Sequence, residues 1–435
     1  MLCGQRAGKS ACRQSKSKPK RGFHLVANAP ELVRFPDHVP PELRWDHSLY
    51  EFTSELDDPF MAASRLLDGP PIVYVRAGGQ GFPGWLIARH ALLKEAFIDW
   101  ENFSSDGGSG ALLTHMLGAD WKLNPVRIDP PMHTVYRKVL VPFFTPKAVS
   151  HMEGGVREIC DTLIAKFEDN GSCDFVKDFA IPFPSYIFLK LMGMPMDMLQ
   201  QFFDWEQRLM RGKNAEEMVA AGREILEYLK LHLEEQKKKP ATPLMESIMN
   251  ARILDGRTLN DGEILGMFFT FYAGGLDTVY ATLGWSMRYI ATHPEFQQFL
   301  RDNPDQMPKA VDELLRMFSV VMTERTVTHD MTWHGVEMKK GDLVFMPIFV
   351  ACRDPEAYPN PHEADLDRKE TMLAFASGPH LCLGMHLARR EIRIALESFL
   401  NRFDDIRIPD GAEYKYHAGP TFNVDSLPIA WERAG

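Results

Sequence analysis

The feature that most constrains the fold is a helical segment that runs without a stop signal from residue 260 to residue 294. Asn260, followed three residues later by Glu263, predicts a capping box at its start, and no helix-ending residue occurs before Pro294. About 33 residues at about 1.5 Å each make a helix roughly 50 Å long. A helix of this length must cross a whole domain, so we expect one large domain built around it.

The centre of this segment contradicts its own helical preference. It reads Phe271-Tyr-Ala-Gly274-Gly275-Leu-Asp277-Thr278, which places two adjacent glycines beside an acid and an alcohol. Each glycine costs about 1 kcal/mol in a helix. Two interpretations stay open. Either the glycines let another helix pack closely while Asp277 makes a structural salt bridge, or the helix opens there and the Thr278 hydroxyl holds a water or a ligand.

Periodicity elsewhere predicts a mainly helical chain with small β-sheets. The expected helices cover residues 91–98, 131–141, 145–169, 194–211 and 215–238, with breaks at Pro142, Gly171, Pro182 and Pro240. The expected short strands cover residues 324–328, 332–337 and 342–348. No internal repeat or convincing linker divides the chain, so we expect a single domain over residues 31–435.

A glycine pattern between two strand-like runs has the form of a nucleotide-binding motif, but we reject that interpretation. Gly79, Gly81 and Gly84 have the spacing of the dinucleotide fingerprint. Pro83 lies inside the pattern, however, and a second strand-like run, residues 85–89, follows where a phosphate site needs a helix. We therefore expect a β-hairpin loop here.

Composition excludes several classes of protein. The chain has 435 residues, of which 45% are hydrophobic and 25% charged, as in an ordinary globular protein. No apolar run reaches the roughly 18 to 20 residues that a membrane-spanning helix needs, so we expect no membrane association. The six cysteines are too sparse and scattered for a disulfide scaffold, which indicates a reducing compartment, and we expect a cytoplasmic protein.

The net charge of −10 is unevenly distributed along the chain. The first 30 residues carry seven Lys or Arg and no Asp or Glu, and subtracting these seven charges from −10 leaves −17 for the remainder. This acidic remainder argues against nucleic acid as a partner. We expect residues 1–30 to be a basic, disordered extension, with a transit peptide or an interaction arm as the alternative.

The residues with the clearest chemical meaning surround Cys382. The loop reads Phe375-Ala-Ser-Gly378-Pro-His-Leu-Cys382-Leu-Gly384 and precedes an amphipathic helix that we expect to run to about residue 401. A thiolate there faces the positive end of the helix dipole, which should lower its basicity and favour it as a metal ligand. The two glycines would let the backbone approach a flat, bulky group against which Phe375 can pack.

Three alternatives to a haem-thiolate site apply to this loop. A single cysteine is most often a structural core residue. Zinc bound by His380, Cys382 and His386 would lack a fourth ligand and the usual paired spacing. A Cys/His nucleophile would lack an orienting acid in this stretch. The pattern Phe-x-x-Gly-x-x-x-Cys-x-Gly is complete, so we favour a haem-thiolate site.

Together with two further motifs, this loop resembles that of the cytochrome P450 family. The resemblance runs from about Phe35 to Trp431 and includes the glycine-interrupted helix centre and Glu313-Leu-Leu-Arg316, whose charges would by themselves be an ordinary solvated helical pair. "GGLDTV", "HLCLG" and "HLARREI" are similar to the bacterial camphor hydroxylase group. The resemblance implies a single-domain cytochrome P450 fold, with haem b between the long central helix and the cysteine-loop helix.

The resemblance also implies catalytic and cofactor-binding roles. Cys382 matches the axial iron ligand, and Phe375 and Gly384 lie beside it in the motif. Asp277 and Thr278 match the acid and the alcohol that supply protons during dioxygen activation, for which a carboxylate and a water-holding hydroxyl are chemically suited.

Further residues match the family's contacts around the haem. The positions that match contacts to the haem propionates are His133, Arg137, Arg325 and His380. Cations and imidazole donors suit carboxylates. Glu313 and Arg316 match a buried structural pair that shapes the haem-binding core.

The implied substrate pocket departs from that of the camphor hydroxylase. Counting back from Asp129-Pro-Pro puts Trp121 where that enzyme has a tyrosine that bonds the substrate ketone, which implies a larger and more apolar wall. Thr323 replaces an acid near a propionate. The other expected pocket positions are Leu112, Val126, Gly274, Val321 and Thr421. We expect a small apolar terpenoid: a monoterpene such as camphor or a cineole, or a norisoprenoid of the ionone type.

The resemblance implies a monomeric monooxygenase that uses O2 and two external electrons per turnover, because the chain has no flavin or nicotinamide module. We expect a 2Fe-2S ferredoxin with a separate NAD(P)H ferredoxin reductase. The docking patch we expect for it consists of Arg89, Arg137, Lys369 and Arg389. The alternatives from other classes are a haem-based sensor without turnover and a zinc or cysteine hydrolase that uses Cys382.

Overall fold

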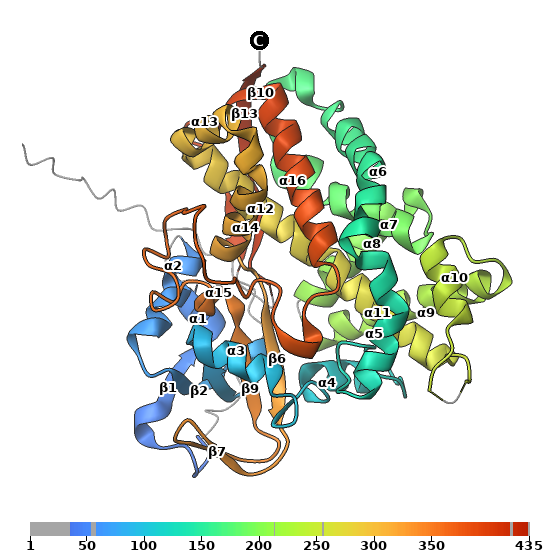
Figure 1. The fold of residues 1–435 in the computed structure, drawn as a ribbon, viewed down its shortest axis with the longest axis vertical. Coiled ribbons are helices and arrows are strands. Elements are labelled where there is room, and N and C mark those ends of the chain that lie inside the picture. Colours follow the sequence, from blue (N-terminus) through green and yellow to red (C-terminus); the bar gives the residue numbers. More distant parts are fainter. Residues whose placement is uncertain (1–34, 54–57, 213, 255, 418–420, 434–435) are drawn as a thin grey trace, which may run out of the picture.

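The structure, a computed structural model, describes residues 35–433 apart from 54–57, 213, 255 and 418–420. The predicted basic extension, residues 1–30, lies outside the described residues. The described chain is mainly helical with small sheets, as predicted, and its sheet-rich part lies beside a larger helical part (Figure 1). Among the described helices, none is both long and apolar enough to span a bilayer.

The elements have the following bounds. The helices are α1 (Leu49–Thr53), α2 (Pro59–Ser64), α3 (His90–Ile98), α4 (Gly108–Met116), α5 (Met132–Phe144), α6 (Pro146–Ile164), α7 (Pro182–Met192), α8 (Leu199–Arg211), α9 (Ala215–Lys238), α10 (Pro243–Asn250), α11 (Asp261–Gly275), α12 (Asp277–Thr292), α13 (Pro294–Asp302), α14 (Met307–Met317), α15 (Ile348–Ala351) and α16 (Met385–Arg402). The strands are β1 (Arg44–Ser48), β2 (Ile72–Ala77), β3 (Gly84–Ile87), β4 (Phe103–Ser104), β5 (Ser172–Asp174), β6 (Met322–Val327), β7 (Met331–Trp333), β8 (Val336–Met338), β9 (Leu343–Pro347), β10 (Phe403–Arg407), β11 (Lys415–His417), β12 (Asn423–Ser426) and β13 (Pro428–Arg433).

The largest sheet has the strand order β1-β2-β3-β9-β6-β4 and lies at the lower left of Figure 1. Strands β2 and β3 pair antiparallel, with Ile72 opposite Ile87 and Val75 opposite Gly84. The glycine pattern that imitates a dinucleotide site therefore connects the two strands of a hairpin, and the predicted hairpin is confirmed. Smaller sheets have the orders β10-β13-β5, β11-β12 and β7-β8.

Local signals fix several helix ends. The Asn214 side chain caps α9 by accepting from the Glu217 amide at 2.9 Å, and this helix has the predicted bounds. The predicted break at Pro142 is wrong, because α5 continues through it to Phe144. A proline so near the helix end removes one hydrogen bond only, and the carbonyl left without a partner belongs to the exposed Lys138, where water can reach it.

Helix α12 is the centre of the core. Every residue from Val279 to Met287 is buried, so this helix is covered on all sides. It packs against α14, α16 and β12. A Cβ added at Gly284 would lie only 3.1 Å from the Val424 Cβ, so strand β12 lies directly on the helix. The Trp285 indole N–H donates to the Phe422 carbonyl at 3.0 Å and ties the same strand segment to α12.

A buried ionic cluster holds the chain that leads toward the Cys382 loop. Arg316 donates through Nε and Nη2 to both carboxylate oxygens of Glu313, at 2.8 and 2.7 Å. Arg368 Nε donates to Glu313 Oε1 at 2.8 Å, and Arg316 Nη1 donates to the carbonyls of Cys352 and Pro361 at 2.7 and 3.0 Å. Glu313 is 5% and Arg316 2% exposed, so this is a buried pair rather than a solvated one. Its hydrogen bonds join α14 to the irregular segment after α15.

A buried carboxyl group lies on α16 without a visible partner. Glu391 is 3% exposed, and its Oε2 has no hydrogen-bond partner among the described residues. Desolvation by burial raises the pKa of this carboxyl well above its ordinary value. Burial therefore favours the protonated, neutral form of this side chain in the folded protein.

We expect Glu391→Gln to remove a pH-dependent loss of stability. The unfolded chain releases this proton near pH 4.3, whereas the folded protein keeps it, so the wild-type protein is destabilised as the pH rises from about 4.3 toward the raised folded pKa. Over that range the wild-type free energy of unfolding should fall by about 1.4 kcal/mol per pH unit relative to the variant. Denaturant titrations of both proteins at several pH values measure this difference.

Glu397→Gln is the control for this experiment, because Glu397 lies on the same helix but pairs with Arg393 at 2.8 Å. It should not reproduce the effect. Parallel pH profiles for the wild-type protein and Glu391→Gln would contradict the prediction.

Candidate active site

The long central helix is interrupted at Leu276, between α11 and α12. The expectation of one continuous helix is therefore wrong, and the two glycines explain the break in different ways. A Cβ added at Gly275 would lie 3.1 Å from the Phe188 ring, so this glycine lets α7 approach. Gly274 is exposed, and a Cβ added there would meet no atom within 4 Å outside its own helix turn. One glycine serves close packing and the other faces open space.

The Thr278 side chain lies on the open side of this interruption. It is partly exposed, and its Oγ donates to the Gly274 carbonyl at 3.1 Å. The Thr278 hydroxyl thus donates its proton to the Gly274 carbonyl, and its oxygen can still accept a hydrogen bond from a water or a ligand.

Asp277, the neighbouring residue, points into the core instead. It is 1% exposed. Its carboxylate accepts from the Thr421 hydroxyl and from Asn423 Nδ2, the latter at 3.1 Å to Oδ1. Asn423 Nδ2 also donates to Thr421 Oγ at 2.7 Å. The described partners of this acid are therefore neutral donors from the segment at β12, which sequence reasoning did not connect with it.

The Cys382 loop is held by its own backbone and by α3. The Cys382 amide donates to the Phe375 carbonyl at 2.9 Å. Gly378 has φ +69°, and a Cβ there would lie 2.6 Å from the Phe97 carbonyl oxygen. The expectation that Gly378 makes room for a bulky ligand is therefore wrong, since it makes room for the α3 backbone. Gly384 differs, because a Cβ there would meet nothing within 4 Å.

The positive charges near Cys382 do not offset the desolvation of its thiolate. The side chain is exposed, yet desolvation by surrounding protein raises its pKa, outweighing the Gly384 amide and the charges of Arg137 and Arg389, which lower it. The expected low basicity is thus wrong for the protein by itself. A thiol that is both accessible and desolvated faces an internal space, and a metal cation there would reverse the balance by stabilising the thiolate.

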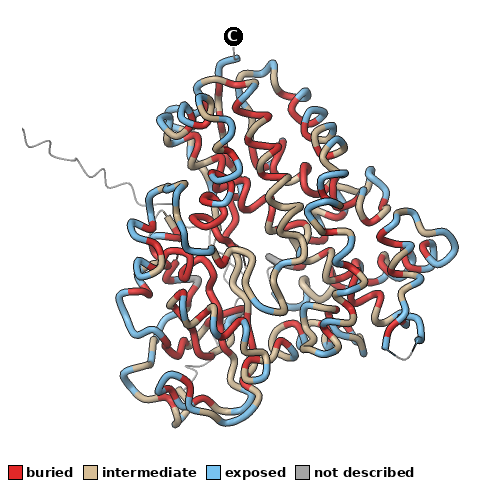
Figure 2. Tube along the Cα trace, viewed as in Figure 1, coloured by how far each residue is buried: buried red, intermediate tan, exposed pale blue. Residues whose placement is uncertain are grey.

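The start of α16 borders the same internal space. Residues 385–390 are all of intermediate exposure, including the apolar ones, whereas residues 394–396 are buried (tan and red in Figure 2). The first two turns of α16 are therefore less covered by protein than the turn that follows them.

Two of the four residues predicted to bind propionates, His133 and His380, lie against each other with their ring planes tilted by 48°. The ring centroids of His133 and His380 are 4.2 Å apart. Both ring nitrogens of His133 are buried and lack hydrogen-bond partners within the described part of the chain. Arg137 donates to the Leu381 carbonyl, beside Cys382. Arg325 donates only to neutral oxygens, Thr323 Oγ at 3.1 Å and the Glu324 carbonyl at 2.8 Å, among its described partners.

Burial and neighbouring arginine charges disfavour the protonated forms of these side chains. Burial, with the Arg137 charge, lowers the pKa of His133 to about 4. Burial, with the Arg325 charge, lowers the pKa of His380 to about 2. Burial, with the Arg127 charge, also lowers the pKa of Arg325 to about 10. Anionic oxygens placed among these side chains would supply their missing hydrogen bonds and counter-charge. The residues present therefore fit a flat group with carboxylates at one edge and a metal cation over Cys382.

Further polar residues complete the cationic cluster and were missed from the sequence. His380 Nε2 and Ser105 Oγ are 3.0 Å apart. Arg127 Nη2 pairs with Glu324 Oε1 at 3.0 Å. Arg127 lies two residues before Asp129-Pro-Pro, and this proximity could have marked it. Nothing in the sequence links Ser105 with position 380.

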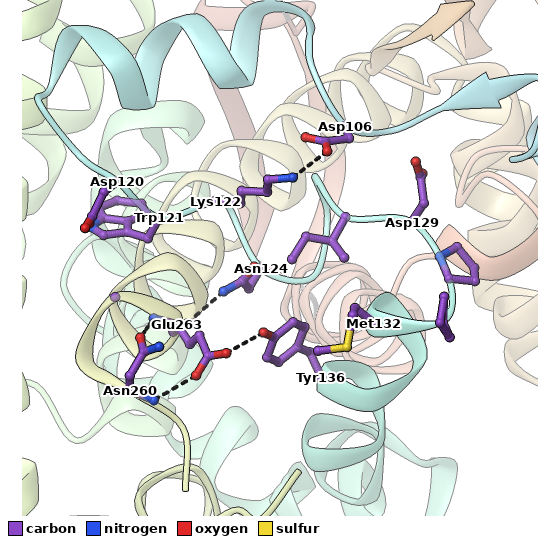
Figure 3. A pocket seen from close by; sticks show the side chains of 14 residues that line it. Asp106, Asp120, Trp121, Lys122, Asn124, Asp129, Met132, Tyr136, Asn260 and Glu263 are labelled. Carbon is purple, nitrogen blue, oxygen red and sulfur yellow. Dashed lines mark hydrogen bonds and ion pairs between the residues drawn. The ribbon is translucent and has the colours of Figure 1, made fainter. Parts of the chain in front are cut away.

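Trp121 lies in a separate pocket of about 670 Å³ (Figure 3). There Tyr136 of α5 and Glu263 of α11 point toward one another and are joined by a 2.6 Å hydrogen bond. Trp121 packs beside Gly262, because a Cβ at that glycine would lie 3.2 Å from the Trp121 Cβ. Gly262 is twelve residues, or about 18 Å along a helix, from Gly274. The centroid of the Trp121 ring also lies 6.1 Å from that of Phe269, five residues before Gly274, so Trp121 lies along the part of α11 between Gly262 and Phe269.

The other predicted pocket residues divide into two groups. Val321 and Thr421 pair as an isolated β-bridge, and Thr421 contacts Asp277, so both belong with the interrupted helix. Leu112 and Val126 are 41% and 45% exposed and lie on α4 and on the loop before α5. No contact recorded for the described residues joins these two to Gly274.

The zinc interpretation of the loop finds no support in the described part of the chain. No group of three His, Cys, Asp or Glu side chains there is placed to hold a metal ion.

Comparison with known proteins identifies the family. The cytochrome P450 family model matches residues 188–417. The chain is 35% identical over 404 residues to "Probable cytochrome P450 127A1" of Sinorhizobium fredii, covering 91% of this chain and 96% of the relative. It is 30% identical to the "Vitamin D(3) 25-hydroxylase" of Pseudonocardia autotrophica, covering 72% of this chain and 79% of the relative.

Solved structures agree with this fold. The structure of cytochrome P450 CYP101C1 superimposes with a TM-score of 0.82 at 28% identity, covering 92% of this chain and 100% of that one. CYP101J2 also superimposes with a TM-score of 0.82, at 27% identity and the same coverage. Because both the sequence and the fold match over most of the chain, it belongs to the cytochrome P450 family, and it is a monooxygenase whose cofactor is haem b with an axial cysteine thiolate.

Proposed function

We propose that this monooxygenase hydroxylates a small, compact, apolar terpenoid. Camphor, a cineole or another monoterpene is one candidate class, and a norisoprenoid of the ionone type is the other. In this reaction one oxygen atom of O2 enters a C–H bond and the other leaves as water, with two electrons and two protons consumed.

One observation carries the choice of an apolar substrate. The Thr421 hydroxyl, the polar group that this wall of the pocket could offer, donates to Asp277 and is therefore engaged. Val321, which pairs with Thr421 in a β-bridge, adds an apolar side chain to the same wall. Walls of this kind hold a substrate by apolar contact and shape. The relatives include proteins named for vitamin D(3) hydroxylation and for polyketide biosynthesis. Membership of the family therefore does not by itself identify the substrate.

We assign the cofactor contacts as follows. Cys382 is the axial ligand, and Gly384 and Phe375 border the ring. Bound haem supplies dioxygen activation and oxygen insertion. The propionates lie among the cationic side chains described above, namely His133, Arg137, Arg325 and His380. The unpartnered nitrogens of His133, and the burial and arginine charge that lower its pKa, support the assignment.

We assign proton delivery to Thr278 and Asp277. Thr278 Oγ lies on the open side of the helix, where it can hold a water and pass a proton along it, and its bond to the Gly274 carbonyl fixes its direction. Asp277 is the adjacent acid, on the core side. A haem-based sensor would need no such pair, which favours turnover over ligand sensing.

We propose a 2Fe-2S ferredoxin, reduced by a separate NAD(P)H ferredoxin reductase, as the electron donor. Its docking patch is smaller than the sequence suggested. Arg89 forms ion pairs with Asp354 and Glu356 at 3.3 and 3.6 Å, and Arg389 pairs with Asp312 at 2.6 Å. The exposed Lys369 remains a candidate contact to an acidic partner.

We also propose a monomer in the cytoplasm. The free cysteines among the described residues, Cys160, Cys173, Cys352 and Cys382, suit a reducing compartment.

Cys382→Ala should abolish the thiolate signature of the cofactor. The reduced protein treated with carbon monoxide should show a red-shifted Soret band in the wild-type protein and lose that shift in the variant, because alanine supplies no sulfur ligand. Cys173→Ala is the matched control and should keep the shift. A wild-type spectrum without the red shift, or a variant that retains it, would reject Cys382 as the ligand.

Thr278→Ala should uncouple reductant consumption from product formation. Product per NAD(P)H should fall about tenfold, less than the roughly 100-fold minimum usual for a lost general acid, because water can partly replace the hydroxyl. Peroxide release should rise in step. Thr278→Ser should retain coupling. Thr282→Ala is the control, since Thr282 makes the same kind of bond, to the Thr278 carbonyl at 3.0 Å, one turn later. Unchanged coupling in Thr278→Ala would remove Thr278 from the mechanism.

A panel of ligands tests the substrate class. Camphor, 1,8-cineole and an ionone should each shift the ferric spin state at lower concentration than a fatty acid, a steroid or a macrolide. Tightest binding of a macrolide or a steroid would reject the terpenoid proposal and leave the family assignment untouched.

A further inference from the structure

The Asp277 carboxylate lies in a pocket of neutral donors built by a distant part of the chain. Asp277, Asn423 and Thr421 are 1%, 0% and 8% exposed. Thr421 and Asn423 follow Asp277 by 144 and 146 residues. An ionised carboxylate removed from water in this way is stable only if hydrogen bonds replace its hydration. These two side chains supply them.

With Asp277 ionised, the hydrogen bonds in this group run in one direction, and Asn423 Oδ1 is buried without a partner among the described residues. Asn423 Nδ2 lies 3.1 and 3.3 Å from the two oxygens of Asp277 and 2.7 Å from Thr421 Oγ. If the amide were turned over, its oxygen would face a carboxylate, which is an acceptor facing an acceptor. Asn423 is therefore the donor to both neighbours. Because Thr421 Oγ accepts from Asn423, its own proton is directed to Asp277.

The backbone that carries Thr421 and Asn423 contacts α12 and the segment before β6. Strand β12 packs against α12, and the Phe422 amide donates to the Val320 carbonyl at 3.2 Å. The bridge between Val321 and Thr421 ties the same segment to the chain that enters β6. Side chains on such a support can hold a neighbour in one orientation.

We propose that Asn423 is a positioning residue for proton delivery: it orients the Thr421 hydroxyl, and the two together hold Asp277 ionised and in a single orientation beside Thr278. This inference rests on the proposed role of Asp277. It adds that the buried amide at position 423, whose described hydrogen bonds go to Asp277 and Thr421, determines how well that acid works. It also explains why the Thr421 hydroxyl is not offered to the substrate.

The test uses the intact holoenzyme and two measurements. Asn423→Leu removes the amide while keeping a side chain of similar size, and Thr421→Val, which is nearly isosteric, is the second variant in case the first does not fold. Ser426→Ala is the matched control: Ser426 lies on the same strand and also donates to a carboxylate, Asp174 at 2.7 Å, away from the helix interruption. Each change is made in the wild-type protein and in Asp277→Asn.

The first measurement is product formed per NAD(P)H consumed, together with the ratio of product formation rates in H2O and D2O. In the wild-type background, Asn423→Leu should lower product per NAD(P)H about threefold or more and raise the solvent isotope ratio, as expected for a weakened proton step. In the Asp277→Asn background it should change neither. Ser426→Ala should change neither in both backgrounds.

The second measurement is the thermal unfolding midpoint, which does not depend on turnover. Asn423→Leu should lower the midpoint by about 2 °C or more in the wild-type background and by clearly less in Asp277→Asn, because residues in one hydrogen-bonded group are not additive. Additive shifts would show that Asn423 does not hold Asp277 and would overturn the inference.

The two proposals fail in different ways. If Asp277→Asn uncouples the enzyme but Asn423→Leu and Thr421→Val do not, the positioning role is wrong and the proposed function stands. If Asp277→Asn leaves coupling unchanged, the proposed proton role of Asp277 is wrong, and the catalytic part of this inference fails with it.

Discussion

The structure at the centre of this protein depends on buried ionisable side chains whose charged forms are not neutralised by other parts of the polypeptide. Burial lowers the pKa values of His133, His380 and Arg325, and neighbouring arginine charges lower them further. A few side chains away, the Cys382 thiol is desolvated and needs positive charge. A cofactor with a cationic metal centre and an anionic edge provides both charges: positive charge beside the Cys382 sulfur and negative charge beside the histidines and arginines. Such a group supplies the counter-charges that the described polypeptide does not provide at this place.

The rest of the architecture holds these two sites in place. Glu313, Arg316 and Arg368 tie α14 to the segment that approaches the cysteine loop. The loop itself rests on α3 through the contact of Gly378 with the Phe97 carbonyl. On the opposite side, α11 and α12 present Gly274 and Thr278. The interruption lies directly after the two helix-weakening glycines, and the buried helix α12 holds its far side in the core.

Much of this arrangement could be predicted from the sequence, and the failures have physical causes. The hairpin at the glycine pattern and the bounds of α9 follow from local signals, a misplaced proline and an asparagine cap. The break at Leu276 directly follows the two glycines at which an opening of the helix was one of two interpretations, whereas the packing of Phe188 on Gly275 is a tertiary contact that could not be predicted. Ser105, Arg368 and Asn423 were missed for the same reason, since each acts on a partner far away in the sequence. The role of Trp121 as a wall of the substrate pocket, inferred by counting across a loop, stays a prediction.

The two glycines of the cysteine loop differ in what makes them necessary. At position 378 the positive φ and the contact with Phe97 exclude other residues on account of the polypeptide alone. At position 384 the polypeptide leaves room for a side chain. In a survey of all substitutions, intolerance at 378 would therefore report on folding, whereas intolerance at 384 would report on the space that the cofactor occupies. One loop thus carries two independent selective pressures, six residues apart.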